Sequence, residues 1–421
     1  MFMDKPLETI IYVTREIERA LGVEPDPRYL IVTNRTPYGE SIKKQYPDFV
    51  TLIENPTQEL LGTTDLLNHV KTAEVFESVR ARAAAPNSGL QAPDCLVFKN
   101  TARVETAVRD HHWNILNPSA ALSEKVENKV TQVEWLGNSA EYYLPHHEIG
   151  PLKKFLYTGE SFVLQWAHGH TGSGTILIDS QAELDALKAK FPYRMTRKSA
   201  FIQGPSFTVN ALVAGPDVLV GNVSYQITGL APFTDSRFAT VGNDWGAAKA
   251  ILSPAEFTSI MTMTRDIGEK LRMSGWRGLY GVDIMRDDER GRIFLIEVNA
   301  RQPASTPFES FLQLAERAKG VPGLTTFEAH LKALLRQPIS EPLIPITDGA
   351  QIVQRVTNTV KSIPEDAVGS LELAGYQTVA YSNTKKDEDL LRIQSMNGIM
   401  SGHGTFNDKG KEIVGMIEDK Q

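Results

Sequence analysis

The stretch GVDIMRDDERGRIFLIEVNAR, Gly281 to Arg301, decides how the rest of the sequence is interpreted. Apolar and β-branched residues dominate 280–285 and 292–298, which predicts two strands. The charged turn RDDERG between them predicts a hairpin. Acidic residues then stand near the strand ends, where the two strands lie side by side.

Four polar side chains define the functional hypothesis for this hairpin. Because residues two apart on a strand share a face, Asp283 lies on one strand while Glu297 and Asn299 share a face of the other, followed by Arg301. Two carboxylates and an amide oxygen are hard ligands that suit Mg²⁺. Arg301 can contact a phosphoryl group or an anionic intermediate. The alternative is a hairpin with a polar solvent face, which the apolar run 294–296 disfavours.

Length and composition set the outer limits. The chain has 421 residues, with 44 Lys plus Arg against 51 Asp plus Glu, a formal charge of −7. We expect two or three domains, and 41% hydrophobic with 23% charged residues excludes a disordered chain, a collagen or a coiled coil. No membrane span, secretory signal or general nucleic-acid affinity is expected. A single cysteine, Cys95, favours a reducing cytoplasm.

Residues 1–117 predict an open α/β domain. Helical spacing over 7–21 predicts an opening helix. Strands alternating with helices indicate a parallel sheet, with strands expected at 29–32, 49–53, 95–98 and 113–116. The turn after the first of these strands contains only Gly39, so the three-glycine dinucleotide fingerprint is absent and we exclude a nicotinamide enzyme.

Residues 118–337 predict a second domain of the α+β type. A helical pattern over about 118–148 is followed by a smaller subdomain at about 150–203, with β-rich runs around a glycine loop. The last segment, 338–421, predicts a small β-rich unit. Within it, the run KKDEDLLR at 385–392 predicts a solvated turn and the start of a helix.

The glycine loop HGHTGSG, residues 168–174, is a candidate phosphate loop. Loops of this kind let backbone N–H groups approach phosphate oxygens, and the hydroxyls of Thr171 and Ser173 add donors. Glycines also mark tight β-turns, and that alternative stays open. No GK[ST] follows, so the loop is not a P-loop.

Four segments, in order from Lys129 to Arg301, together resemble the ATP-grasp superfamily of ligases. ENKVTQVEWL resembles the family's first helix, and SFVLQW with its glycine loop resembles the lid strand and phosphate loop. SAFIQGPSFTVNALV resembles the hinge of the D-alanine–D-alanine ligase branch, and GVDIM with FLIEVNAR resembles the metal-binding strands. The resemblance implies an ATP-grasp fold, α/β and α+β, behind a Rossmann-like pre-ATP-grasp domain, with the small β-rich unit at the C-terminus.

The resemblance also implies roles for individual residues. Lys129 would hold the nucleotide phosphates and share catalysis with Arg301, while Asp283, Glu297 and Asn299 would bind Mg²⁺, for which Mn²⁺ is expected to substitute. At the hinge, the Ala200 carbonyl and the Ile202 N–H would meet the adenine edge. The complete set of ATP contacts would be Lys129, Gln165, His170, Thr171, Gly172, Ser173, Gly174, Ala200, Phe201, Ile202 and Ser206.

Two positions depart from the family pattern. Gln165 stands where the family has a second phosphate-binding lysine, and Ser206 stands where an acid normally accepts the ribose hydroxyls. A neutral amide supplies no charge, so either turnover is slow or a nearby side chain compensates, the candidates being Arg194, Arg197, Lys198 and His170.

The implied reaction is activation of a substrate carboxylate by ATP as an acyl phosphate, followed by attack of an amine, with release of ADP and phosphate. We expect an amino acid or peptide substrate contacted by Arg237, Arg301 and Ser305. Arg237 lies within 228–245, which is a candidate substrate loop, with an ordinary surface loop as the alternative. The alternative is a nucleotide-binding protein with weak or lost catalysis. The other partner that we expect is a second copy of the chain, as in many relatives, with neither nucleic acid nor a membrane.

Overall fold

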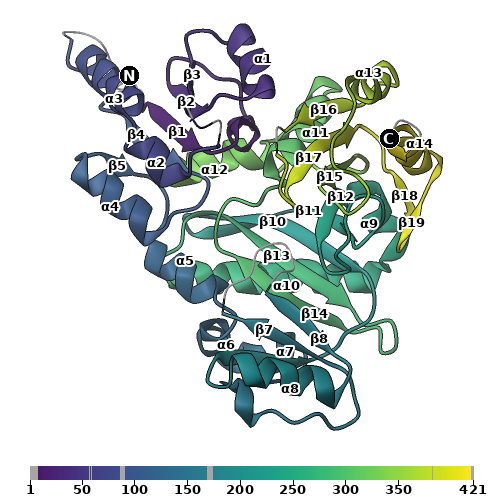
Figure 1. Ribbon diagram of the computed structural model, residues 1–421. Helices are drawn as coiled ribbons and strands as arrows, with labels where there is room; N and C mark the ends of the chain where they lie inside the picture. The colour runs from purple at the N-terminus through teal and green to yellow at the C-terminus, as the bar shows by residue number, and fades with distance from the viewer. Residues whose placement is uncertain are drawn as a thin grey trace.

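The computed structural model describes residues 8–55, 57, 59–85, 91–167, 174–381 and 383–418, and these form four sheets with flanking helices (Figure 1). A parallel sheet, an antiparallel lid sheet and a large antiparallel central sheet account for most of the chain, and a short hairpin completes it. This arrangement confirms the expected fold class. In the described part of the chain, no helix is both long and apolar enough to cross a membrane.

The N-terminal sheet is parallel and has the strand order β3-β2-β1-β4-β5. Mostly buried and mainly apolar residues form the four longer strands, and an apolar core packs on each face. The strands are β1 (Ile10–Thr14), β2 (Tyr29–Asn34), β3 (Val50–Ile53), β4 (Asp94–Val97) and β5 (Asn114–Ile115). The helices are η1 (Ile17–Ala20), α1 (Pro37–Gln45), α2 (Thr63–Leu67), α3 (Val70–Ala83) and α4 (Ala102–Asp110).

The prediction of an opening helix over 7–21 is wrong for the described residues. Residues 10–14 form the central strand β1, and only 17–20 turn as a short 3₁₀ helix. Every residue of β1 is buried, because other elements cover both faces of the sheet. A strand buried on both faces is continuously apolar, so it lacks the alternation that would distinguish it from a helix.

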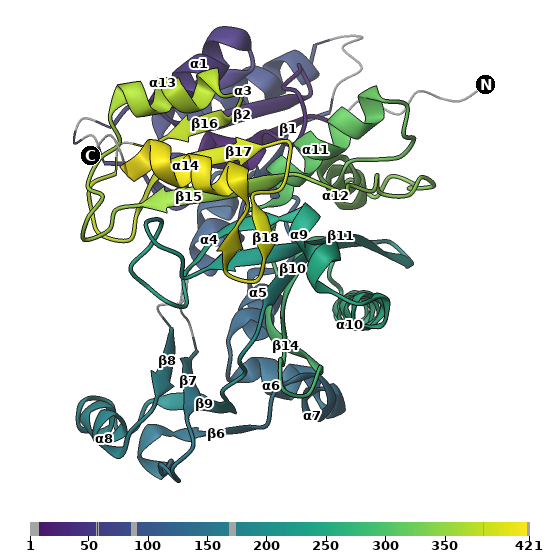
Figure 2. The ribbon, with the colours of Figure 1, turned by 90° about the vertical axis from the view of Figure 1, so that its right-hand side faces the viewer.

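The lid follows three short helices, α5 (Ala120–Glu127), α6 (Thr131–Leu136) and α7 (Asn138–Tyr143). Its strands pair antiparallel in the order β6-β9-β7-β8 and lie far from the N-terminal sheet (Figure 2). The lid elements are β6 (His147–Pro151), η2 (Leu152–Lys154), β7 (Phe162–Trp166), β8 (Thr175–Ile178), α8 (Gln181–Lys190) and β9 (Met195–Ala200). A separate small core, which includes Leu164 and Leu184, holds the lid together.

The central sheet is antiparallel and has the order β14-β13-β10-β11-β12-β15-β17-β16. The long helix α10 (Pro254–Met273) packs on one face through Ile260, Met263 and Ile267, which recur at helical spacing. The other face is partly covered by α12 (Thr326–Leu334), which follows α11 (Thr306–Ala318). The elements of this sheet that precede α11 are β10 (Ser206–Ala214), β11 (Asp217–Thr228), β12 (Thr240–Asp244), α9 (Trp245–Ile251), β13 (Gly278–Arg286) and β14 (Ile293–Asn299).

The C-terminal strands extend the central sheet beyond β12. They are β15 (Ala350–Arg355), β16 (Gln377–Ala380) and β17 (Asp389–Ser395), accompanied by α13 (Glu365–Leu373), β18 (Met400–Gly402), β19 (Thr405–Phe406) and α14 (Asp408–Glu418). The predicted helix start within 385–392 is wrong, since β17 begins at Asp389. The predicted loop 228–245 is also too long, because residues 240–244 pair as β12.

Candidate active site

A cavity of about 640 Å³ lies between the lid, the central sheet and the N-terminal domain. All the predicted site residues that the structure describes line it: Lys129, Gln165, Gly174, Ala200, Phe201, Ile202, Ser206, Arg237, Asp283, Glu297, Asn299, Arg301 and Ser305. The predicted loop residues His170, Thr171, Gly172 and Ser173 lie outside the described residues. Residues far apart in the sequence thus meet at one hollow.

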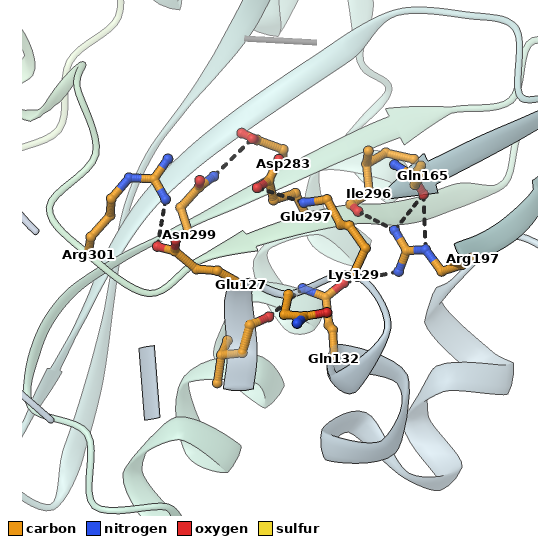
Figure 3. Close-up of polar contacts among 12 residues, drawn as sticks. Glu127, Lys129, Gln132, Gln165, Arg197, Asp283, Ile296, Glu297, Asn299 and Arg301 are labelled. Carbon is orange, nitrogen blue, oxygen red and sulfur yellow. Dashed lines mark hydrogen bonds and ion pairs between the residues drawn. The ribbon is translucent and has the colours of Figure 1, made fainter. Parts of the chain in front are cut away.

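The predicted metal ligands meet at the β13–β14 hairpin. Asp283 and Glu297 are direct partners in the antiparallel ladder, so their side chains share the face that lines the cavity. Asn299 Nδ2 donates a 2.9 Å hydrogen bond to Asp283 Oδ2, as Figure 3 shows. The hairpin therefore brings together the two carboxylates and the amide that the alternation predicted.

The charges at this hairpin fit a divalent cation. Burial, together with the neighbouring Glu297 carboxylate, raises the pKa of Asp283 to about 6. Glu297 behaves differently: burial opposes ionisation, yet Lys129 and Arg301 hold the pKa of its carboxyl below the usual value. A dication relieves such carboxylate crowding, and oxygen ligands suit Mg²⁺. The described residues contain no cluster of three His, Cys, Asp or Glu suited to a metal, and the predicted set of ligands is two carboxylates with the Asn299 amide.

Lys129 lies in the turn between α5 and α6, not within a helix as the family resemblance implied. The turn forms because the Asn128 side chain accepts a hydrogen bond from the Val130 N–H. Lys129 Nζ lies 2.6 Å from Glu297 Oε1, and its backbone N–H donates to the Ala167 carbonyl at the end of β7. Burial lowers the pKa of Lys129, against the opposing effect of Glu297. The ammonium group is thus held beside the predicted metal ligands.

Arg197 occupies the position beside Gln165 on the next lid strand, where the two residues are register partners of β9 and β7. Its Nε and Nη2 both donate to Gln165 Oε1, at 2.9 and 2.7 Å, and Nη1 donates to Gln132 Oε1 at 3.1 Å (Figure 3). Nη2 also donates to the Ile296 carbonyl. Burial lowers the pKa of Arg197 to about 10. Its hydrogen-bond partners among the described residues are neutral, so a buried cation faces the cavity.

The other described candidates for this compensating charge point elsewhere. Arg194 lies over the rings of Trp166 and Phe191. Lys198 lies over Phe162 and 3.8 Å from Glu148. Neither lines the cavity, whereas Arg197 does. Alternation along β9 turns Arg197 and Lys198 to opposite faces, which accounts for the difference.

Arg301 follows the end of β14 and forms an ion pair with Glu127, the last residue of α5. Its Nη1 is 2.5 Å from Glu127 Oε1, and the other oxygen of Glu127 accepts from Lys99. Burial opposes the charge, but Glu127 and Glu297 raise the pKa of Arg301 above its usual value. Arg301 is therefore a fixed, permanently charged group beside Glu297.

The hinge connects the lid to the central sheet. Ala200 ends β9, Phe201 and Ile202 cross over, and Ser206 begins β10, all lining the cavity. Gly204 takes φ +151°, and a Cβ there would lie 2.1 Å from the Arg286 carbonyl oxygen. Only glycine permits this crossing, which anchors the hinge against β13.

Arg237 and Ser305, the two other predicted substrate contacts, differ in whether their polar groups are free to bind a ligand. Arg237 is exposed, and its guanidinium lies over the rings of Phe201 and Phe238, beside the hinge. The Ser305 hydroxyl is buried and exchanges hydrogen bonds with the Asn210 side chain. Ser305 lines the cavity, but its hydroxyl is already used within the protein.

Two residues of the site were missed from the sequence. The Thr208 hydroxyl and Gln226 Nε2 each donate a 2.8 Å hydrogen bond to Asp283 Oδ1. Each stands next to buried apolar residues in a strand that also carries other polar residues, so the local sequence held no clear signal for either. Together with Asn299 they orient the Asp283 carboxylate toward the cavity.

The family comparison agrees with this geometry. Residues 126–305 match the family model of the ATP-grasp domain. This segment, which contains the lid, the hinge and the β13–β14 hairpin, is therefore an ATP-grasp domain. Among curated protein sequences, none is similar enough to this chain to count as a match.

Several solved structures share the fold over nearly the whole chain. An N5-carboxyaminoimidazole ribonucleotide synthetase in complex with ADP has a TM-score of 0.62 at 12% identity, covering 99% of this chain and 98% of its own. The corresponding synthase from Aspergillus clavatus, complexed with ATP, gives 0.61 at 15%, covering 98% and 99%. An L-amino acid ligase from Bacillus licheniformis gives 0.60 at 12%, covering 98% of each chain. At these identities the likeness establishes the shared ATP-grasp fold.

Proposed function

We propose that this protein is an ATP-dependent ligase that activates a substrate carboxylate as an acyl phosphate and joins it to an amine. The observation that carries the proposal is the meeting of Asp283 and Glu297 with three cationic side chains, Lys129, Arg197 and Arg301, around one cavity. The two carboxylates suit a divalent cation, and the three cationic side chains suit a triphosphate and a substrate carboxylate. The solved ligases with the same fold, two of them bound to ADP or ATP, support it.

In this proposal the nucleotide would lie between the lid and the central sheet, with its base at the hinge. The adenine would lie against the Ala200–Ile202 backbone, with Ser206 near the ribose, and the phosphates would extend toward Lys129 and Arg197. Asp283, Glu297 and Asn299 would hold Mg²⁺, which offsets phosphate charge when bound. Phosphoryl transfer requires positioning and charge stabilisation, so no side-chain nucleophile is needed.

The reaction then has two steps. An oxygen of the substrate carboxylate forms a bond to the γ-phosphorus, while the bond from that phosphorus to the bridging oxygen breaks and ADP leaves. The amine nitrogen next attacks the acyl carbon, a proton leaves the nitrogen, and phosphate departs. Arg301, fixed by Glu127, would donate to the acyl phosphate oxygens and to the tetrahedral oxyanion that follows.

We propose an amino acid or a peptide as the substrate, and the structural likeness to an L-amino acid ligase supports this choice. A nucleotide-binding protein without catalysis is the second candidate, because Gln165 and Ser206 are neutral. The buried Arg197 beside Gln165 favours the active enzyme, since it supplies a cation where the glutamine has none.

Substrate-dependent phosphate release tests the proposal. Purified protein with ATP and Mg²⁺ is incubated with single amino acids, pairs of amino acids and dipeptides, and with bicarbonate in a parallel series. We expect ADP and phosphate in equal amounts, together with a condensed product seen by mass spectrometry. ATP binding without substrate-dependent ADP formation across the panel would identify the second candidate instead.

Arg301→Lys is expected to lower kcat by roughly 10–100-fold while leaving ATP affinity nearly unchanged, because lysine cannot form the two parallel hydrogen bonds of a guanidinium group. Steady-state phosphate release and calorimetric titration of the nucleotide separate the two effects. Lys99→Gln is the matched control, since Lys99 shares Glu127 with Arg301 but does not line the cavity. Equal losses in both variants would assign Arg301 a structural role.

A further inference from the structure

The cavity floor is one face of the central sheet, and polar residues cross it from strand to strand. Register partners across β14, β13, β10 and β11 are Glu297, Asp283, Thr208 and Ser224. The row continues across β11, β12, β15 and β17 with Gln226, Asn243, Gln351 and Gln394. The metal ligands stand at one end of this face. The proposed function explains only that end.

Two buried arginines stand at the other end. Arg355 on β15 and Arg392 on β17 are 5% and 6% exposed, and both line the cavity. Arg355 Nη2 donates to the Thr240 carbonyl at 2.7 Å. Arg392 donates to Tyr381 Oη and, at 3.3 Å, to Gln351 Oε1. We call Arg355 and Arg392 the arginine pair.

One carboxylate, that of Asp389, forms long ion pairs with both guanidinium groups. Asp389 lies 3.6 Å from Arg355 Nε and 3.7 Å from Arg392 Nη2, beyond hydrogen-bond length for both. Arg355 Nε is buried without a hydrogen-bond partner in the described part of the chain. Because a guanidinium group carries five N–H donors, most donors of the pair are unused within these residues. Two cations beside one carboxylate leave an excess positive charge.

The nearby acidic residues do not remove this excess. Tyr381 Oη donates to Glu18 of η1, and Glu16, which directly precedes that element, is hydrogen-bonded by Arg19. Burial, followed by the charge of Glu16, raises the pKa of Glu18, which favours its neutral form. Arg392 also acts on both carboxyls, since its charge lowers the pKa of Glu16 and opposes the rise for Glu18. Among the described residues, Asp389 is the one carboxylate that forms an ion pair with both arginines of the pair.

The arginine pair is too far from the metal ligands to serve the same small group. In strand order, β15 is four strands beyond β13, and β17 is five. With neighbouring strands about 4.8 Å apart, Asp283 and the pair are separated by roughly 19–24 Å along the sheet. A triphosphate held at Lys129 would not reach the arginine pair, so the nucleotide does not account for these two cations.

We propose that the arginine pair binds a carboxylate or phosphate group of the substrate, remote from the atom that reacts beside Arg301. The inference rests on the proposed function and narrows its substrate class to molecules with a second anionic group. A planar guanidinium group binds either anion through two parallel hydrogen bonds. The unpartnered Arg355 Nε and the weakly engaged Arg392 Nη2 supply donors toward such a group.

The test is anion binding to protein saturated with Mg²⁺ and the non-hydrolysable β,γ-imido analogue of ATP, which fills the triphosphate site. Inorganic phosphate and succinate are titrated separately by calorimetry. We expect one saturable site, and the anion that binds more tightly indicates which group the substrate carries. Absence of saturable binding by both anions overturns the proposal.

Two near-isosteric variants shift the local charge in opposite directions. Gln351→Glu places a carboxylate against Arg392 and is expected to weaken anion binding roughly tenfold, whereas Asp389→Asn removes the competing carboxylate and is expected to tighten it several-fold. Arg301→Gln is the control and should leave this binding unchanged. Loss in Arg301→Gln, or equal affinity in the two isosteric variants, would contradict the proposal.

The same series separates this inference from the proposed function. Titration of the ATP analogue alone tests the nucleotide site. If the analogue does not bind, the anion titrations are repeated without it, and the opposite shifts of Gln351→Glu and Asp389→Asn still decide the arginine pair. Circular dichroism and thermal unfolding of each variant verify that the fold is retained.

Discussion

Asp283→Asn is expected to abolish phosphate release, by roughly 10³-fold or more, while leaving the protein folded. The substitution removes one of two carboxylates that would hold Mg²⁺ but keeps the size of the side chain and its contacts with Thr208 and Gln226. An uncharged amide offsets far less of the cation's charge. Steady-state assays at saturating Mg²⁺ and ATP measure the loss.

The same substitution is expected to stabilise the ligand-free protein at pH 7. Burial and Glu297 raise the folded-state pKa of Asp283 from 3.8 to about 6, so folding favours its protonated form. That contribution is fully present below about pH 4 and is lost as pH rises through about 6. The amide of the variant cannot ionise, so we expect a gain of about 1–3 kcal/mol at pH 7 that disappears below about pH 4.

Thermal unfolding of the wild-type protein and of Asp283→Asn between about pH 4 and pH 8, without metal, measures the expected gain in stability. Together with the activity assay it shows whether the variant gains stability while losing activity. Asp288→Asn is the matched control, because Asp288 lies in the turn of the same hairpin and does not line the cavity. Full activity in Asp283→Asn would refute the metal assignment. If the pH dependence of unfolding is the same in Asp283→Asn as in the wild-type protein, the raised pKa of Asp283 is refuted, while the metal assignment is unaffected.

The β13–β14 hairpin could be predicted because the sequence features that define it lie within one short segment. Apolar runs, a charged turn and alternation together placed Asp283, Glu297 and Asn299 on one face, and the ladder has this pairing. The failures share a different cause. In β17 the polar residues Asp389 and Arg392 face a cavity instead of solvent, so a buried strand resembled a solvated turn. Burial by distant segments is not visible in a local pattern.

The position of Arg197 shows the same limit at the site itself. The sequence revealed that Gln165 lacks a charge and left four candidates for compensation. Choosing among them requires the register of β7 against β9, in which Gln165 and Arg197 are opposite each other. Register depends on the whole lid sheet and its core, and therefore on contacts that no single segment contains.

Arg197→Gln is expected to weaken binding of the ATP analogue roughly 10–100-fold and to lower turnover at least as much. The substitution removes a cation whose described partners are neutral and which therefore has charge available for phosphate. Calorimetric titration with Mg²⁺ measures the affinity. Lys198→Gln, on the same strand but facing away from the cavity, is the control and should change affinity by less than about twofold.

Moving the charge across the strand pair separates a phosphate role from a structural one. Gln165→Lys alone puts a second cation against Arg197 and removes the oxygen that accepts from its Nε and Nη2, so it should weaken binding and destabilise the lid. The double variant Gln165→Lys, Arg197→Gln restores one cation and one amide at this position. We expect it to recover most of the nucleotide affinity, which requires strong coupling in a double-mutant cycle. If the affinity losses of the two single variants simply add in the double variant, Arg197 has only a structural role in the lid. Phosphate binding then depends on Lys129 and not on Arg197.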